Sequence, residues 1–66
     1  MIKIENTTLT RDNTGHKVTY VPRHAHGNAN HKDAECGVIS SWNDKFVFVD
    51  YRGNIKATPP ELLVWG

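Results

Sequence analysis

Four side chains in the middle of the sequence have the chemistry of zinc ligands. His24 and His26 are two residues apart, so they point to the same side if the segment is extended. His31 and Cys36 follow, and two to four imidazole and thiolate groups are what tetrahedral Zn²⁺ sites use. Their spacing matches no standard zinc motif, and the chain lacks a paired C-x-x-C. We therefore favour a polar loop with exposed histidines, a buried structural cysteine and no cofactor. A zinc-stabilised module is the last of three functional alternatives.

Cys36 is also a candidate nucleophile, because it is the only cysteine of the chain. A reactive thiol needs a neighbouring cation or a helix N-terminus to favour the thiolate, whereas Cys36 follows the acidic Glu35. The chain has no G-x-S-x-G motif, no phosphate-binding glycine loop and no paired carboxylates arranged for acid–base chemistry. The sequence therefore predicts that the protein is not an enzyme.

Basic and aromatic residues lie near one another in the sequence, as in proteins that bind nucleic acid. Nucleic-acid binding is the second of the three functional alternatives. Small β-barrels bind single strands through aromatic faces flanked by cations. The residues that would form such a surface are Arg23, Lys32, Lys45 and Arg52 with Trp42, Phe46 and Phe48. Acidic residues are interleaved with these cations, and the net charge is only +1. An ordinary solvated surface over a core of aromatic residues explains the same pattern.

Protein recognition is the favoured function. Tyr20, Trp42 and Tyr51 would line a groove for an extended peptide, and Phe46 with Phe48 would alternatively pair two copies of the chain. The candidate residues for binding a protein or a nucleic acid are Tyr20, Arg23, His24, His26, His31, Lys32, Trp42, Phe46 and Phe48.

The elements that must position these side chains are short β-strands. Alternating apolar residues and strand-favouring residue types predict strands at residues 1–5, 16–22, 35–42, 45–51, 55–58 and 62–65. Polar residues predict loops at 6–15 and 23–34. Asn43-Asp44 predicts a two-residue hairpin, 52–54 a tight turn, and Pro59-Pro60-Glu61 one turn of tight helix.

The faces of the two central strands follow from the period of two. Val47, Val49 and Tyr51 should share one face of their strand, and Phe46 and Phe48 the other. In the preceding strand the pattern places Val38, Ser40 and Trp42 on one face, and Cys36, Ile39 and Ser41 near the other.

Length and composition predict one domain over residues 1–66, with an N-terminal strand and polar loop at 1–14 and a barrel at 15–65. We expect an all-β fold: an SH3-like barrel of five or six short antiparallel strands with a 3-10 turn near the C-terminus. No apolar run is long enough to span a membrane, and the N-terminus lacks a secretory signal. With a single cysteine, these features predict a cytoplasmic protein.

The chain also resembles a group of small proteins. The pattern consists of Gly15, Val18, Tyr20, Pro22, His24, Ala25 and Gly27, then 36–41, Asn43-Asp44, 47–49 and Pro60-Glu61 with Leu63-Val64. It is similar to small, mostly uncharacterised SH3-like proteins encoded by bacteriophages and prophages. The resemblance implies an accessory protein of the host-cell cytoplasm that binds a host or phage protein. Asp50 departs from the basic residue of that pattern and weakens any use of this face for nucleic acid.

Overall fold

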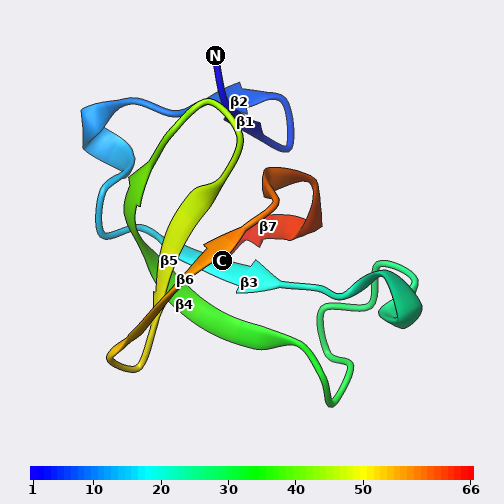
Figure 1. The fold of residues 1–66 in the computed structure, drawn as a ribbon. Helices are drawn as coiled ribbons and strands as arrows, with labels where there is room; N and C mark the ends of the chain where they lie inside the picture. The colour runs from blue at the N-terminus through cyan, green and yellow to red at the C-terminus, as the bar shows by residue number, and fades with distance from the viewer.

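The computed structural model describes all 66 residues, and it is built from short strands joined by tight turns (Figure 1). The strands are β1 (Lys3–Ile4), β2 (Thr7–Thr8), β3 (Lys17–Tyr20), β4 (Glu35–Trp42), β5 (Val47–Tyr51), β6 (Asn54–Thr58) and β7 (Leu63–Trp65). Three single turns of 3-10 helix are η1 (Arg11–Asn13), η2 (Arg23–Ala25) and η3 (Pro60–Leu62). No helix is long and apolar enough to cross a membrane. The all-β prediction is confirmed, as is the tight turn at the prolines near the C-terminus.

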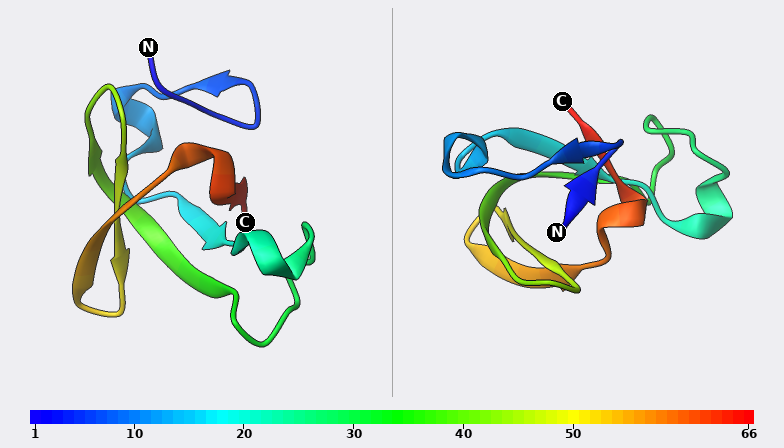
Figure 2. Two further views of the ribbon diagram at one scale, coloured as in Figure 1. Left: turned by 45° about the vertical axis from the view of Figure 1, so that its right-hand side comes forward. Right: turned by 90° about the horizontal axis from the view of Figure 1, so that it is seen from above.

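Five strands form one antiparallel sheet in the order β6-β5-β4-β3-β7, while β1 and β2 form a separate hairpin. The sheet curls strongly, as the view from above shows (Figure 2). Its outer strands, β6 and β7, do not pair with each other, so hydrogen bonding leaves the sheet open. Closure into a barrel, as expected from the sequence, is therefore not confirmed.

The longest strand, β4, contains an irregularity that turns its side chains. The pairing of β4 with β5 shifts between Ile39 and Ser41, which places Ile39 opposite Val49 and Trp42 opposite Val47. Directly opposed residues in a sheet share a face, so Ile39 and Trp42 both lie on the core side. The predicted separation of these two side chains onto opposite faces was wrong, because strict alternation does not allow for a bulge.

The core lies on the concave side of the sheet. Val18, Ile39, Val47, Val49 and Leu63 are at most 2% exposed. The N-terminal hairpin covers this side with three further buried side chains, Ile2, Ile4 and Leu9. Alternation along β5 is confirmed, since Val47, Val49 and Tyr51 are buried while Phe46 is 38% exposed.

The segment predicted as a polar loop at 6–15 contains the strand β2 and the turn η1, so that prediction was wrong in part. Glu5 and Asn6 both have positive φ, which closes a tight turn between β1 and β2. The Trp65 indole N–H donates to the Ile4 carbonyl oxygen at 3.2 Å. The hairpin is thus fixed to the last strand, where it covers one end of the core.

The turn between β4 and β5 is wider than the predicted two-residue hairpin. Trp42 pairs with Val47, which leaves four residues between the strands. The Asn43 side-chain oxygen accepts hydrogen bonds from the backbone N–H groups of Lys45 and Phe46, each at 2.8 Å. Such local bonds stabilise a longer turn without requiring the positive φ of a two-residue hairpin.

Candidate functional site: a cleft at the base of the histidine loop

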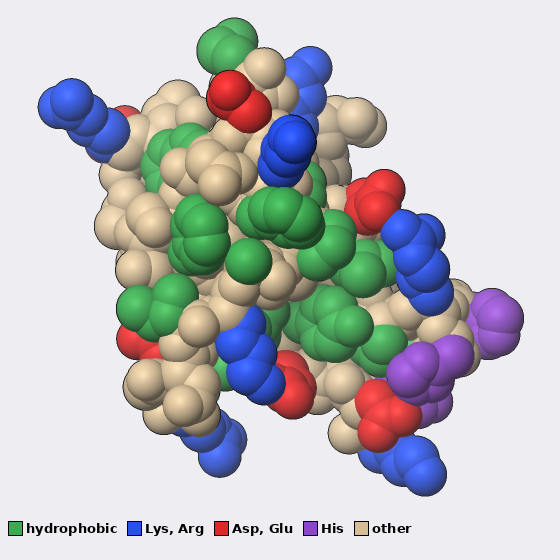
Figure 3. Space-filling view, in the orientation of Figure 1, with side chains coloured by type: hydrophobic (Ala, Val, Ile, Leu, Met, Phe, Trp, Pro, Cys, Tyr) green, Lys and Arg blue, Asp and Glu red, His purple; other side chains and the backbone are tan.

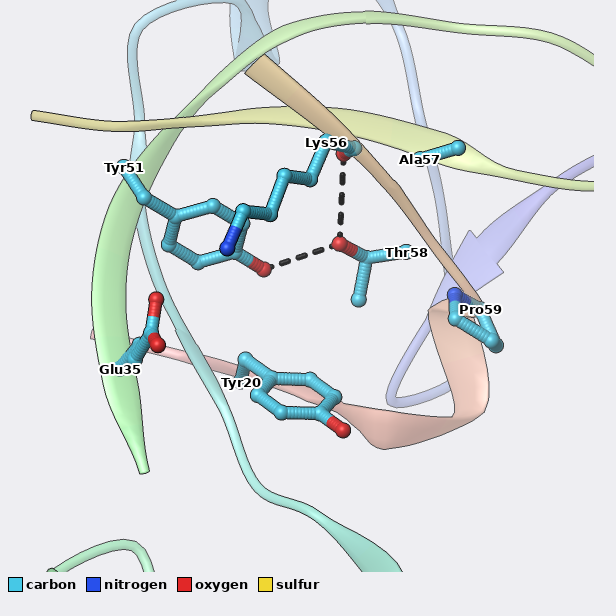
Figure 4. A pocket seen from close by; sticks show the side chains of 7 residues that line it. All are labelled: Tyr20, Glu35, Tyr51, Lys56, Ala57, Thr58 and Pro59. Carbon is cyan, nitrogen blue, oxygen red and sulfur yellow. Dashed lines mark hydrogen bonds between the residues drawn. The ribbon is translucent and has the colours of Figure 1, made fainter. Parts of the chain in front are cut away.

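An open cleft of about 260 Å³ lies at one end of the concave side (Figure 4). Its walls come from the end of β3, the start of β4, the end of β5, and the last three residues of β6 with the proline that follows. The lining residues are Tyr20, Glu35, Tyr51, Lys56, Ala57, Thr58 and Pro59. We call residues 23–34 the histidine loop. The chain leaves the sheet after Tyr20, passes through this loop and returns to the sheet at Glu35. Tyr20 and Glu35 are direct partners in the pairing of β3 with β4. The cleft therefore lies at the base of this loop.

The cleft exists because the sheet is open. Lys56 and Thr58 of β6 lie opposite Val49 and Val47, so they face the same side as the core. No strand pairs with the outer side of β6. Lys56 is consequently exposed although it lies on the core side of the sheet. At this edge of the sheet, the exposed side chain of Lys56 takes the place of the apolar core side chains.

One hydrogen-bonded pair anchors the wall of the cleft. The Tyr51 hydroxyl lies 2.9 Å from the Thr58 hydroxyl oxygen, and Thr58 in turn donates to the Lys56 carbonyl oxygen at 3.3 Å (Figure 4). Either hydroxyl can be the donor in the contact between Tyr51 and Thr58. Burial raises the pKa of Tyr51 above its ordinary value of 10.0, and the hydrogen bond to Thr58 acts in the opposite direction. The neutral phenol is thus the form that the fold favours.

The cleft offers both apolar and charged surface to a ligand. The rings of Tyr20 and Tyr51 and the side chain of Pro59 provide flat apolar surface, while Glu35 and Lys56 supply one charge of each sign. Tyr20 is half-buried and packs against the core.

The histidine loop has a short internal structure of its own. Arg23 makes an ion pair with Glu61 of η3, and Ala25 is the buried residue of the turn η2. His24 Nε2 lies 2.8 Å from Asp33 Oδ2. His31 Nδ1 lies 3.8 Å from the same oxygen. The loop thus brings two histidines and one carboxylate together.

The predicted ligand set was His24, His26, His31 and Cys36, and the structure brings only His24 and His31 of these together. His26 has left-handed backbone geometry at the end of η2. Cys36 is exposed, with its sulfur 3.6 Å from the Thr19 hydroxyl. The prediction of a buried structural cysteine was wrong, because Cys36 lies on the outer face of β4.

The other predicted binding residues are spread over the molecule. Trp42 packs against the core away from the cleft, and Phe48 faces the convex side, where it pairs with Ala57. Lys45 and Arg52 lie in the turns at opposite ends of β5. Figure 3 shows hydrophobic side chains gathered at the centre of one face, with Lys and Arg scattered around them and histidines at one edge. Lys32 extends from the histidine loop, so the four predicted cations do not form one patch.

Five lining residues and one loop residue were missing from the sequence-based site. They are Glu35, Lys56, Ala57, Thr58, Pro59 and Asp33. Lys56, Ala57 and Thr58 depend on the register between β5 and β6, and Glu35 reaches the cleft through its pairing with Tyr20 across β3 and β4. Asp33 had a signal in the sequence, since a carboxylate two residues after His31 is an ordinary metal ligand, but no spacing rule joined it to His24.

Comparison with protein-family models, with curated proteins and with solved structures gives no significant match.

Proposed function

We propose that this protein is a non-enzymatic interaction module that binds an extended segment of a partner protein in the cleft at the base of the histidine loop. The observation that carries the proposal is the cleft itself, in which Tyr20, Tyr51 and Pro59 present apolar surface and Glu35 and Lys56 lie beside Tyr51 (Figure 4). Grooves lined by aromatic residues bind extended, proline-containing peptides, because such peptides lose little conformational entropy on binding.

The strand order supports an SH3-like assignment for this module. The sheet runs β6-β5-β4-β3-β7, and the turn η3 separates β6 from β7. The long connection between β3 and β4, residues 21–34, includes the histidine loop and borders the cleft. We further propose that the protein is an accessory protein of phage or prophage type whose partner is a host or phage protein in the host cytoplasm. The similarity of its turn and strand residues to such proteins is the support for that part.

The chemistry of the cleft defines the peptide that would fit. Proline or small apolar side chains would pack on the rings of Tyr20 and Tyr51, and a basic side chain would pair with Glu35. A carboxylate at the other end of the segment would pair with Lys56. A peptide with these features would lie across the ends of β3 and β4 rather than along the open edge of β6.

The test starts from a library of random peptides selected on the purified protein. Synthetic versions of the selected peptides are titrated into the wild type and into Tyr20→Ala, with binding measured by calorimetry. We expect at least about a tenfold loss of affinity, because removing an aromatic anchor at a binding site commonly costs more than 1 kcal/mol. Circular dichroism checks that Tyr20→Ala remains folded.

Phe48→Ala is the matched control, because Phe48 is an aromatic residue on the opposite face of the sheet. It should bind the peptides as the wild type does. If Phe48→Ala loses binding and Tyr20→Ala keeps it, the convex face is the recognition surface and the cleft proposal is wrong. Chemical-shift changes mapped by NMR on the wild type decide the same question without any variant.

A further inference from the structure

The cluster of His24, His31 and Asp33 has no role in holding the sheet together. All three side chains lie in the histidine loop, and His24 and Asp33 are 63% and 49% exposed. Their three ligand atoms lie within 4.8 Å of one another. We propose that these residues form a Zn²⁺ site with three protein ligands.

The distances between the ligand atoms suit one small cation. A Zn²⁺ ion with ligands at 2.0–2.1 Å in tetrahedral geometry holds neighbouring ligand atoms about 3.3 Å apart. In the loop, Asp33 Oδ2 lies 2.8 Å from His24 Nε2 and 3.8 Å from His31 Nδ1. These separations lie on either side of the required value, and all three ligand atoms lie within 4.8 Å of one another. Bringing them onto one ion therefore requires rotation of the exposed His24 and Asp33 side chains and of the partly buried His31 side chain.

The donor types select the kind of metal. Two imidazole nitrogens and one carboxylate oxygen are the ligand set of open zinc sites and of related transition-metal sites. Ca²⁺ and Mg²⁺ require mainly oxygen ligands in larger number, so the loop does not suit them. With three protein ligands, the fourth position of Zn²⁺ stays available to water or to a side chain of a partner.

Metal binding exchanges two hydrogen bonds of the loop for coordination. At present the His24 Nε2–H donates to Asp33 Oδ2, and the Asp33 backbone N–H donates to His31 Nδ1 at 3.0 Å. Zn²⁺ would bind the lone pair of Nε2 in the other ring tautomer, in which the proton has moved to Nδ1, so the neutral ring neither gains nor loses a proton. Coordination by His31 would likewise free the Asp33 N–H, which is exposed and can bond to water. Both lost bonds are at the surface, so their loss is compensated by solvent.

The site would fix the shape of the histidine loop. His24 belongs to η2, whereas His31 and Asp33 lie near the return to β4. The ion pair of Arg23 with Glu61 already holds the first part of the loop on η3. A metal that joins the two parts would make the whole loop one rigid border of the cleft.

The first measurement is calorimetry of the untagged chain titrated with zinc chloride. We expect one ion per chain. His24→Gln, His31→Gln and Asp33→Asn should each lower the affinity by more than about 100-fold, since losing even a residue that only supports a ligand costs 10- to 100-fold. His26→Gln is the matched control, a histidine of the same loop outside the cluster, and it should leave the affinity unchanged.

The second measurement uses the wild type alone. In an NMR titration with zinc chloride, the imidazole signals of His24 and His31 and the backbone amide signal of Asp33 should shift together, while His26 and His16 stay unchanged. Co²⁺ in place of Zn²⁺ should give the visible absorption of a tetrahedral or five-coordinate ion. The proposal is overturned if millimolar zinc chloride gives no complex of one ion per chain, or if His26→Gln weakens binding as much as His24→Gln.

Discussion

The curved sheet and the histidine loop differ in what their residues are needed for. In the sheet, the inward side chains of β3, β4 and β5 that are buried are Val18, Ile39, Val47, Val49 and Tyr51, and their residue types follow from that burial. In the loop, Ala25 is the only buried residue, and the polar side chains bond mainly to one another and to the loop backbone. A loop of this length could be stable with many other compositions. The presence of three histidines in it is therefore better explained by function than by folding.

The same contrast separates the two ends of the concave side. At the end covered by the N-terminal hairpin, Ile4 and Val18 are fully buried. At the other end the open edge of β6 leaves Lys56 exposed, while Thr58 lines the cleft and is itself buried. The cleft thus arises where the small core stops covering its own sheet.

The largest expected effect comes from the core. Ile39→Ala removes a side chain that is 1% exposed, and such truncations cost about 2–5 kcal/mol of the free energy of unfolding. For a chain of 66 residues this is a large part of the total stability. Lys32→Ala in the histidine loop should change it by less than about 0.5 kcal/mol. Urea unfolding followed by tryptophan fluorescence measures both, and similar losses in the two variants would contradict the contrast between sheet and loop.

The next largest effect concerns the close crossing of β4 and β5. A Cβ atom at Gly37 would lie 2.6 Å from Val49 Cγ1 and 2.7 Å from the Asp50 carbonyl oxygen. Gly37→Ala should therefore destabilise the fold by about 1–3 kcal/mol, as overpacked sites do. Cys36→Ser is the control at the exposed neighbouring position, and it should be close to neutral in thermal unfolding. An equally stable Gly37→Ala would mean that β4 can move away from β5.

A smaller effect is expected at the hydrogen bond in the wall of the cleft. Tyr51→Phe removes the hydroxyl that bonds to Thr58, whose own hydroxyl keeps the Lys56 carbonyl oxygen as a partner. The loss should be about 0.5–1.5 kcal/mol, the usual contribution of one such bond. Thr58→Val tests the same bond from the other side. Matching losses in the two single variants and little further loss in the double variant are expected from chemical unfolding.

Tyr51 also gives the stability of the wild type an alkaline limit. Because the pKa of Tyr51 is raised in the folded protein, the neutral phenol is favoured there more than in the unfolded chain. Its contribution is complete below the unfolded value of 10.0 and is lost as the pH rises through the higher folded value. Tyr51→Phe should lack this part of the alkaline loss. The measurement is the free energy of unfolding of the wild type and of Tyr51→Phe as a function of pH across this range. If the two proteins lose stability in parallel, Tyr51 does not contribute to the alkaline loss.

The smallest effect is expected where the loop meets the sheet. Arg23 and Glu61 are 72% and 62% exposed, so Arg23→Gln should lower the global stability by less than about 1 kcal/mol. Hydrogen exchange of the amides at 23–34 should nevertheless become faster, because the loop loses a point of attachment. Glu61→Gln should reproduce this local change. Unchanged exchange in both variants would show that η2 is held by Ala25 alone.

Much of the sheet was predictable from local patterns. Alternation along β5 separated Val47, Val49 and Tyr51 from Phe48, and the two prolines identified the tight turn η3. The strand at 1–5 was predicted, but its partner β2 was missed, because a two-residue strand gives no period to detect. Trp42 was placed on the wrong face, because the bulge in β4 depends on its pairing with β5. The candidate site was predicted only in part: Tyr20, His24 and His31 belong to the region, while Glu35, Lys56 and Asp33 join it through contacts between distant or looped segments.

The sequence alone determined that this protein is all-β, that Val47, Val49 and Tyr51 share one face of β5, and that residues 23–34 form a polar, histidine-rich loop. These properties depend on side-chain period, backbone propensity and composition, which are local. Only the tertiary structure decided which side chains meet. The register of β6 on β5 brings Lys56 and Thr58 to the side of Tyr51, and the fold of the loop brings Asp33 to His24. Both depend on pairing across the chain, which no local pattern encodes.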